Sequence, residues 1–209
     1  MKDSISPLDS RYSSETEELL PYFSERALIR YRIKVEIEYL IALSKEKTLV
    51  GLPAFTKKQE ATYRKIYSNF NASTAKEVKK VEQRTNHDVK AVEYYIRSKI
   101  NKSIHPWVHF ALTSEDVNNL SYTLMWRDAL KKVYIPQLTQ VLKDLKTLSN
   151  KYADTAMLSM THGQPATPTT FGKEIRVFVN RVERQINEIN KHKFLGKFGG
   201  ATGTWSAHM

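Results

Sequence analysis

The sequence has no cysteine among its 209 residues. This absence excludes a disulfide framework, a thiolate nucleophile and any zinc or iron–sulfur site built on cysteine, and it is typical of a reducing compartment. Long apolar runs are also missing, because no stretch approaches the roughly 18 uncharged residues that a membrane span needs. The first residues contain no apolar core of a secretion signal. We therefore predict a soluble, cytoplasmic protein with no membrane association.

Glycine and proline are scarce, with seven of each. Since both residues interrupt helices and occupy turns, their scarcity favours long helices over many short strands. Ser24 is the expected N-cap of a first helix, and Thr56 with Gln59 has the capping-box spacing at the start of a second. The spacing of apolar residues predicts four helices, over residues 24–47, 56–70, 74–84 and 88–101. The sequence therefore predicts an all-α fold.

A much longer helix is predicted further along the chain. Ser114 is its expected cap, and it runs to about Tyr152 with a kink at Pro136. At 1.5 Å per residue such a helix extends roughly 55 Å, too far for a chain of this size to cover. We therefore expect a helical bundle built partly from other subunits.

The remaining segments are expected to be a loop, a final helix and a glycine-rich tail. The loop is predicted over residues 153–169, and the helix begins at Thr167 or Thr169 and ends near His192. A domain boundary is expected in the segment around Pro106. We predict an N-terminal helical domain over residues 1–108, and the first part of a central helical-bundle domain over residues 109–209.

The chain is basic, with 33 Lys and Arg against 22 Asp and Glu, a formal net charge of +11. This balance attracts anions such as nucleic acids, phosphorylated metabolites and polycarboxylates. Residues 57–102 contain much of the excess, which is compatible with a nucleic-acid surface. Solvated helix faces of mixed charge explain it better, so we predict no nucleic-acid partner.

Three polar clusters and one arginine–tyrosine pair are candidate sites. His162 and Gln164 lie in a turn between two predicted helices, where an imidazole can exchange a proton near neutral pH. The other candidates are at expected helix starts or in the N-terminal segment, and comprise Arg11, Tyr12, Asn86, His87, Asp88, Thr113 and Ser114. Free amides at a helix start suit an anion. Taken alone, the His162 turn is better explained by a histidine that caps a helix, and the clusters at the two helix starts are explained equally well by capping. Arg11 alone is explained by a surface arginine.

A metal site is not predicted. His105 and His109 have the i, i+4 spacing of two ligands on one helix face. However, Pro106 lies between them and no acidic third ligand follows at a recognisable distance.

Taken together, four motifs resemble the adenylosuccinate lyases of the fumarase/aspartase superfamily, in the same order along the chain. They cover residues 9–12, 84–94, 113–119 and 161–168. Gly163 stands where fumarases and argininosuccinate lyases have leucine, which favours the adenylosuccinate lyases. The alternatives are another lyase or a carboxymuconate cycloisomerase-like enzyme of this superfamily, a basic module that binds anions or nucleic acid, and a non-catalytic helical assembly protein.

The resemblance implies an all-α homotetramer in which long central helices form one shared bundle. It implies elimination of fumarate from two small-molecule substrates, adenylosuccinate and the succinyl-carboxamide ribotide SAICAR, giving AMP and AICAR without a cofactor or metal. By resemblance His162 is the catalytic acid and His87 holds the substrate. The residues that match substrate-binding positions are Arg11, Tyr12, Asn86, Asp88, Thr113, Ser114 and, more weakly, Gln164.

One expected feature of the family is missing from the sequence. The family's serine base lies in a loop of the type Ser-Ser-x-Met-Pro-x-Lys-x-Asn, and no such sequence occurs before Met209. The chain therefore resembles the N-terminal part of such an enzyme, and we expect it to be inactive by itself.

Overall fold

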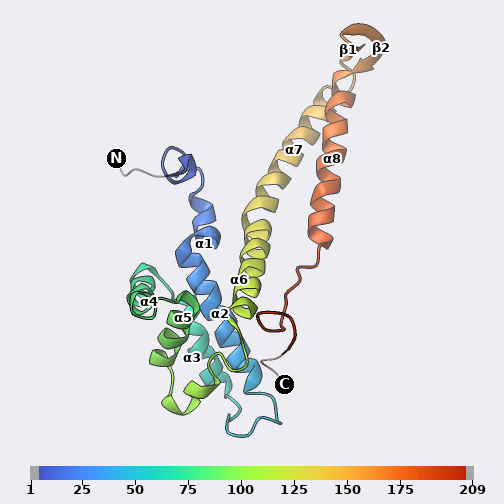
Figure 1. Ribbon diagram of the computed structural model, residues 1–209. Helices are drawn as coiled ribbons and strands as arrows, with labels where there is room; N and C mark the ends of the chain where they lie inside the picture. Colours follow the sequence, from blue (N-terminus) through green and yellow to red (C-terminus); the bar gives the residue numbers. More distant parts are fainter. Residues whose placement is uncertain (1–4, 206–209) are drawn as a thin grey trace. The chain divides into compact units, whose positions relative to one another are not determined.

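The computed structural model describes residues 5–205, and these are mostly helical (Figure 1). The α-helices are α1 (Leu20–Phe23), α2 (Glu25–Leu43), α3 (Lys57–Ser68), α4 (Ala72–Thr85), α5 (Asp88–Lys99), α6 (Ser114–Ala129), α7 (Ile135–Lys151) and α8 (Phe171–Lys191). Shorter helical turns are η1 (Pro7–Asp9), η2 (Glu17–Leu19), η3 (Lys102–Trp107) and the π-helical turn η4 (Leu130–Tyr134). The two strands are β1 (Ala156–Thr161) and β2 (Gln164–Thr170). None of the helices between residues 5 and 205 has the length and apolar character that crossing a bilayer requires.

The described residues form two compact units. The first comprises residues 5–128 and 195–205, and the second comprises residues 129–194. Each unit has its own apolar cluster of buried side chains. Each is therefore described by itself.

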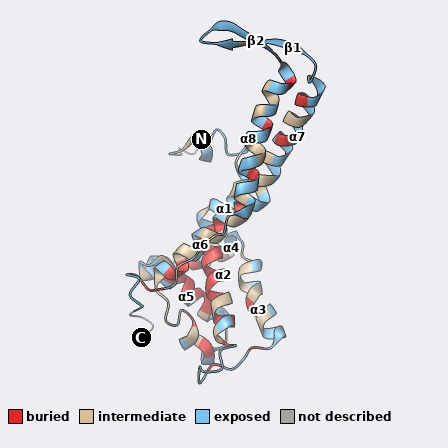
Figure 2. Ribbon diagram, turned by 90° about the vertical axis from the view of Figure 1, so that its right-hand side faces the viewer, coloured by how far each residue is buried: buried red, intermediate tan, exposed pale blue. Residues whose placement is uncertain are grey.

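In the first unit, α2 is the central helix and packs against α3, α4 and α5. Figure 2 shows that the buried residues of this unit concentrate on α2 and α5. The fully buried side chains of Ile33 and Ile37 belong to this core, together with Val92 and Ile96 of α5. Burial of each such side chain contributes roughly 2 kcal/mol to folding. Apolar residues at helical spacing thus hold the unit together, as the sequence predicts.

The predicted caps of this unit are confirmed. The Ser24 hydroxyl accepts a hydrogen bond from the Ala27 amide at 3.1 Å, one turn into α2. At the start of α3, Thr56 Oγ1 accepts from the Gln59 amide at 3.2 Å, and Gln59 Oε1 accepts from the Thr56 amide at 2.9 Å. Both donors of this capping box are otherwise orphans at a helix start, which is why the motif predicts helix starts well.

Every residue from 114 to 151 is helical, as predicted, but the irregularity lies before Pro136 rather than at it. The Ile135 amide donates to the carbonyl of Leu130, five residues back, in the π-helical turn η4. Proline lacks an amide proton and its ring clashes with the preceding turn of an α-helix. The wider π turn directly before Pro136 lets the helix continue.

In the second unit, α7 and α8 run side by side in opposite directions and are joined by the β-hairpin (Figure 1). Their shared core contains Leu142, Val179 and Ile186. Gly172 allows the start of α8 to approach the end of α7, because an added Cβ would lie 2.3 Å from the Ser149 carbonyl oxygen. The Ser149 hydroxyl donates to the Gly172 carbonyl at 2.9 Å across this contact.

The predicted loop over residues 153–169 is wrong, because most of this segment forms the antiparallel hairpin of β1 and β2. Pro165 and Pro168 argue against strands, but proline is tolerated where its missing amide faces away from a partner, and both strands of a two-stranded sheet are edges. The hairpin is largely exposed on both faces, so it lacks the apolar alternation that indicates a strand. The cap of α8 is Thr170 rather than Thr167 or Thr169.

Candidate functional site

The residues predicted to form a site are divided between the two units. Those in the N-terminal segment and at the starts of α5 and α6 belong to the first unit, and those of the hairpin belong to the second. The first group is Arg11, Tyr12, Asn86, His87, Asp88, Thr113 and Ser114, and the second is His162 and Gln164.

The segment from Asn86 to Asp88 is a tight junction between α4 and α5. Asn86 ends α4 in the left-handed conformation with a φ of 49°, and its amide donates to the Glu82 carbonyl at 2.8 Å. Asn86 is therefore the C-cap of α4 and does not cap the following helix. Asparagine tolerates this conformation better than most residues. His87 is itself the N-cap of α5, and Asp88 is the first residue of that helix.

The hydrogen bond that caps α5 determines which ring nitrogen of the neutral His87 carries the proton. His87 Nδ1 accepts a hydrogen bond from the Lys90 amide at 3.2 Å, so Nδ1 has no proton of its own. The proton of the neutral ring then lies on Nε2. Since His87 is exposed, its Nε2–H can donate a hydrogen bond to a ligand. This geometry makes the neutral His87 ring a hydrogen-bond donor through Nε2 and leaves Nδ1 unavailable as a base.

Arg32 of α2, which no local sequence pattern singles out, joins this junction to the start of α6. Its Nη2 lies 2.7 Å from Asp88 Oδ2, and its Nε donates to Asn118 Oδ1 at 2.9 Å. Burial alone would raise the pKa of Asp88, but the Arg32 charge and the Val89 amide outweigh it and hold the pKa below its usual value. Asp88 is therefore a carboxylate at neutral pH.

The Thr113–Ser114 motif lies at the start of α6, where Ser114 is the first helical residue and not the cap. The Thr113 amide and hydroxyl both donate to Asp116 Oδ2 at 2.9 Å. The Thr113 hydroxyl proton is thus engaged, while its oxygen lone pairs stay available as acceptors. The Ser114 hydroxyl makes no hydrogen bond to another residue within 5–205 and can donate to an anion.

Asp116 itself is a structural anchor. It is fully buried, and its Oδ1 accepts from the Gly199 and Gly200 amides at 3.0 and 3.1 Å. Burial by itself would raise the pKa of Asp116, but the amides of Gly199 and Thr113 outweigh it and lower the pKa well below its usual range. The glycine-rich tail is thereby attached to the same helix start that presents Thr113 and Ser114.

A second buried ionic contact lies one turn along α2. Glu36 is completely buried, and its Oε1 lies 2.5 Å from His109 Nδ1. Burial alone would lower the pKa of His109, but the Glu36 carboxylate raises it above its ordinary value. His109 and Ala111 both adopt positive φ, at 63° and 55°, in the segment leading to α6. Glu36 therefore fixes an irregular segment that ends at Thr113.

Arg11 and Tyr12 are exposed and contact each other, with the guanidinium carbon 5.3 Å from the ring centroid. Such a cation–π contact at the surface contributes about 0.5–1 kcal/mol. It leaves the guanidinium edge available for a phosphate or carboxylate.

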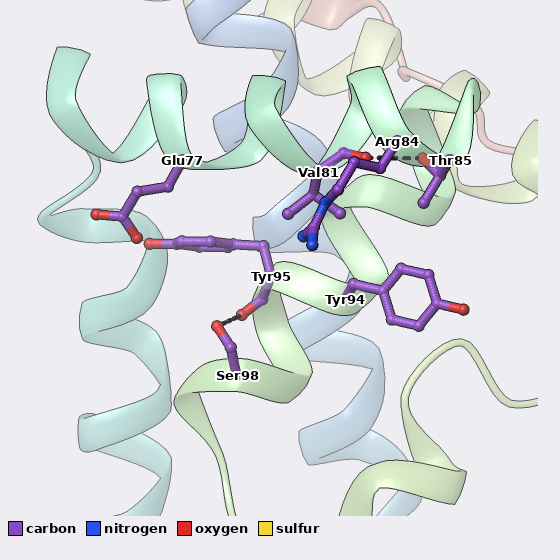
Figure 3. Close-up of a pocket in the computed structure, with 7 residues that line it drawn as sticks. All are labelled: Glu77, Val81, Arg84, Thr85, Tyr94, Tyr95 and Ser98. Carbon is purple, nitrogen blue, oxygen red and sulfur yellow. Dashed lines mark hydrogen bonds between the residues drawn. The ribbon is translucent and has the colours of Figure 1, made fainter.

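Two cavities border the junction. One of about 580 Å³ is lined by Lys79, Glu82, Gln83, Asn86, His87 and Asp88, and therefore contains three predicted site residues. The other cavity, of about 460 Å³, lies between α4 and α5 (Figure 3). Arg84, Tyr94 and Tyr95 contribute to its lining, which contains none of the predicted site residues. In Figure 3 the Arg84 side chain points into the space between the two tyrosines. The first cavity is the better candidate for the predicted site.

His162 is at the tip of the hairpin. His162 and Gly163 are the two central residues of the turn, with φ of 50° and 74°, and Thr161 pairs with Gln164. Two positive φ values are typical of the hairpin turns whose twist matches that of the strands. Gly163, the second central residue of the turn, is the sequence signal from which the hairpin could have been predicted. The turn leaves the His162 imidazole exposed.

His105 and His109, the two histidines with i, i+4 spacing, contact different groups. His105 Nε2 lies 3.4 Å from the Ile100 carbonyl oxygen, whereas His109 contacts Glu36. Within residues 5–205 no group of three His, Asp or Glu side chains is arranged to hold a metal ion.

Comparisons with known proteins point to the same family as the four motifs. A family model described as lyase matches residues 10–209. Adenylosuccinate lyases of Legionella pneumophila (strain Corby) and Dictyostelium discoideum are 44% and 46% identical over 212 and 213 residues. That of Escherichia coli (strain K12) is 39% identical over 210 residues. These matches cover 98–99% of this chain but 46% of each relative, so the chain spans about half the length of the curated relatives it matches.

Solved structures show the same fold. The fumarate lyase from Mesorhizobium sp. BNC1 superposes with a TM-score of 0.72 at 19% identity, covering 91% of this chain and 44% of that one. The β-carboxy-cis,cis-muconate cycloisomerase from Acinetobacter calcoaceticus sp. ADP1 gives a TM-score of 0.68 at 20% identity, with the same coverage. The predicted all-α fold of the fumarase type is confirmed.

Proposed function

The chain belongs to the lyase family, and from this premise we propose that it carries the acid-bearing half of an adenylosuccinate lyase active site. The observation that carries the proposal is the 39–46% identity to adenylosuccinate lyases along almost the whole chain. The geometry supports it, because an exposed histidine at a fixed turn and two helix starts with free donors suit an anionic substrate.

The proposed reaction is a β-elimination. A base removes a proton from the succinyl carbon next to the carbon that bears nitrogen, and the resulting carbanion is stabilised by the adjacent carboxylate. The carbon–nitrogen bond then breaks, leaving fumarate, and His162 gives its proton to the departing nitrogen. Adenylosuccinate yields AMP and SAICAR yields AICAR. The base comes from a segment of the family that has no counterpart within these 209 residues.

The remaining site residues bind the substrate in this proposal. His87 donates from Nε2, because its Nδ1 is occupied by the Lys90 amide. Ser114 and the amides at the start of α6 hold a carboxylate or phosphate oxygen, and Arg11 with Tyr12 contacts the phosphate. Asn86 and Asp88 line the cavity beside His87. Gln164, next to the His162 turn, orients the substrate.

The same proposal includes a homotetramer in the cytoplasm, with active sites built from several subunits. Exposed apolar side chains on α7 and α8, among them Val141, Leu148, Phe171 and Phe178, support it, because further helices would cover them. Residues 1–108 would form the N-terminal domain and residues 109–209 the beginning of the shared bundle.

The test measures fumarate release from adenylosuccinate and SAICAR. It uses this chain and a version extended to the length of its curated relatives. We expect activity in the extended protein alone, and His162→Ala should lower its kcat by roughly 100- to 10,000-fold, the usual contribution of a general acid. The matched control is His192→Ala, which removes another exposed histidine of the same unit. An inactive extended protein, or equal effects of the two substitutions, would contradict the proposal.

A further inference from the structure

We propose that Arg32 is the positioning residue of the predicted substrate site. In this proposal it fixes Asp88, and through it the His87 cap, relative to the helix start that presents Thr113 and Ser114. The inference deepens the proposed function and rests on it for the identity of the ligand. The placement itself can be tested without any catalytic activity.

The first argument is that one guanidinium joins two distant chain segments. Arg32 contacts Asp88, the first residue of α5, and Asn118, the fifth residue of α6. Both partners are separated from Arg32 by dozens of residues in sequence, yet Asp88 is itself a predicted site residue and Asn118 lies four residues after Ser114. A lysine would present a single point charge, whereas the planar fork of arginine can hold both acceptors at once.

The second argument is burial. Arg32 is only 5% exposed, so it does not reach a ligand in the cavity. The Asp88 side chain is 48% exposed, and this residue lines the cavity of about 580 Å³ with Asn86 and His87. Arg32 holds one carboxylate oxygen, Oδ2, while Oδ1 accepts from the Val89 amide at 2.8 Å. Arg32 therefore acts on a ligand only through Asp88 and its neighbours.

The third argument is that rigid packing surrounds the contact. Val35 of α2, Val89 of α5 and Val117 of α6 form a buried cluster. Val89 directly follows Asp88 and Val117 directly precedes Asn118, so the ionic contact lies at the polar edge of this cluster. An interaction built on packed helices holds its geometry more precisely than one on loops. Here it would hold the donor Nε2–H of His87 at a constant distance from Ser114.

The placement is tested on the 209-residue chain by NMR. Nitrogen-15 shifts of the His87 ring above neutral pH report its tautomer, and hydrogen exchange of the Lys90 amide reports the cap. Arg32→Gln should speed this exchange by about tenfold or more and lower the population of the Nε2–H tautomer. Arg32→Lys keeps the buried charge and therefore controls for loss of signal through unfolding. Its Lys90 exchange rate and His87 tautomer population should lie between those of the wild type and Arg32→Gln.

The matched control is Arg64→Gln. Arg64 also makes a two-pronged ionic contact, with Glu38 at 2.8 and 3.0 Å, but it lies on α3 and touches no predicted site residue. Arg64→Gln should leave the His87 ring shifts and the exchange rate of the Lys90 amide unchanged. If Arg32→Lys and Arg32→Gln also leave both signals unchanged, the inference is wrong whatever the protein catalyses.

The ligand side is tested by kinetics on the extended protein. Arg32→Lys should raise the KM for adenylosuccinate about tenfold with kcat within roughly twofold, because small displacements of binding groups weaken substrate positioning. Arg64→Gln should change neither constant. An active wild type with an unchanged KM in Arg32→Lys would overturn the inference alone. An inactive wild type would overturn the proposed function, and the NMR result would still decide the role of Arg32.

Discussion

Replacing Asp116 with asparagine should lower the free energy of unfolding of the first unit by about 3 kcal/mol. The Asp116 carboxylate is fully buried and accepts four hydrogen bonds, from the Thr113 amide and hydroxyl and from the Gly199 and Gly200 amides. It ties the start of α6 to the glycine-rich tail. Asparagine has nearly the same shape, so the change keeps the packing while it removes the carboxylate and its ion pair with Lys197, whose Nζ lies 3.4 Å from Oδ1.

The magnitude follows from what the amide can still accept. Its oxygen can keep the Gly199 and Gly200 amides, and its NH₂ group then faces Thr113, whose hydroxyl can accept a hydrogen bond but whose amide loses its partner. The retained bonds weaken from charge-assisted bonds of about 1.5–3 kcal/mol to neutral ones of about 0.5–1.5 kcal/mol. Relief from burying a charge offsets part of this loss. A net cost of about 3 kcal/mol is a large fraction of the stability of a domain.

The effect should depend on pH with a definite sign. Because the folded-state pKa of Asp116 lies below its unfolded value, the carboxylate stabilises the folded state fully above the unfolded pKa of about 3.9. This contribution is lost as the pH falls through the lowered folded pKa. The difference between wild type and Asp116→Asn should therefore be constant from about pH 5 to pH 8 and shrink in stronger acid.

The assay is urea unfolding followed by tryptophan fluorescence, because Trp107, Trp126 and Trp205 all lie in the first unit. The matched control is Glu115→Gln, which removes the same charge from the same helix start at an exposed residue. It should cost only about 0.3–1 kcal/mol through the helix dipole. Equal losses for the two variants would show that Asp116 acts by charge alone and would refute the reasoning.

Two further substitutions test the packing and the caps. Gly172→Ala should destabilise the second unit by about 3 kcal/mol, because the new Cβ would lie 2.3 Å from the Ser149 carbonyl oxygen. Since alanine normally favours a helix over glycine, a stabilised variant in thermal unfolding followed by circular dichroism would contradict this contact. Thr56→Ala should cost about 1 kcal/mol in urea unfolding by removing the cap on the Gln59 amide. An unchanged midpoint would show that this capping box contributes nothing.

The helices of this protein were predictable because their signals are local. The cap at Ser24, the capping box at Thr56 and the continuation of the helix past Pro136 depend on residues within a few positions of one another. Hydrogen bonds and apolar spacing at this range are written directly in the sequence. The order of the four motifs likewise identified the family without any coordinates.

Tertiary structure decided the rest, since it depends on contacts between distant residues. Nothing near Arg32 in the sequence indicates that its guanidinium reaches both Asp88 and Asn118, or that Glu36 meets His109. The hairpin that carries His162 was missed because its exposed strands lack an alternating pattern. Local chemistry thus determined which residues are candidates, and the packing of α2 against α5 and α6 determined which of them are held together.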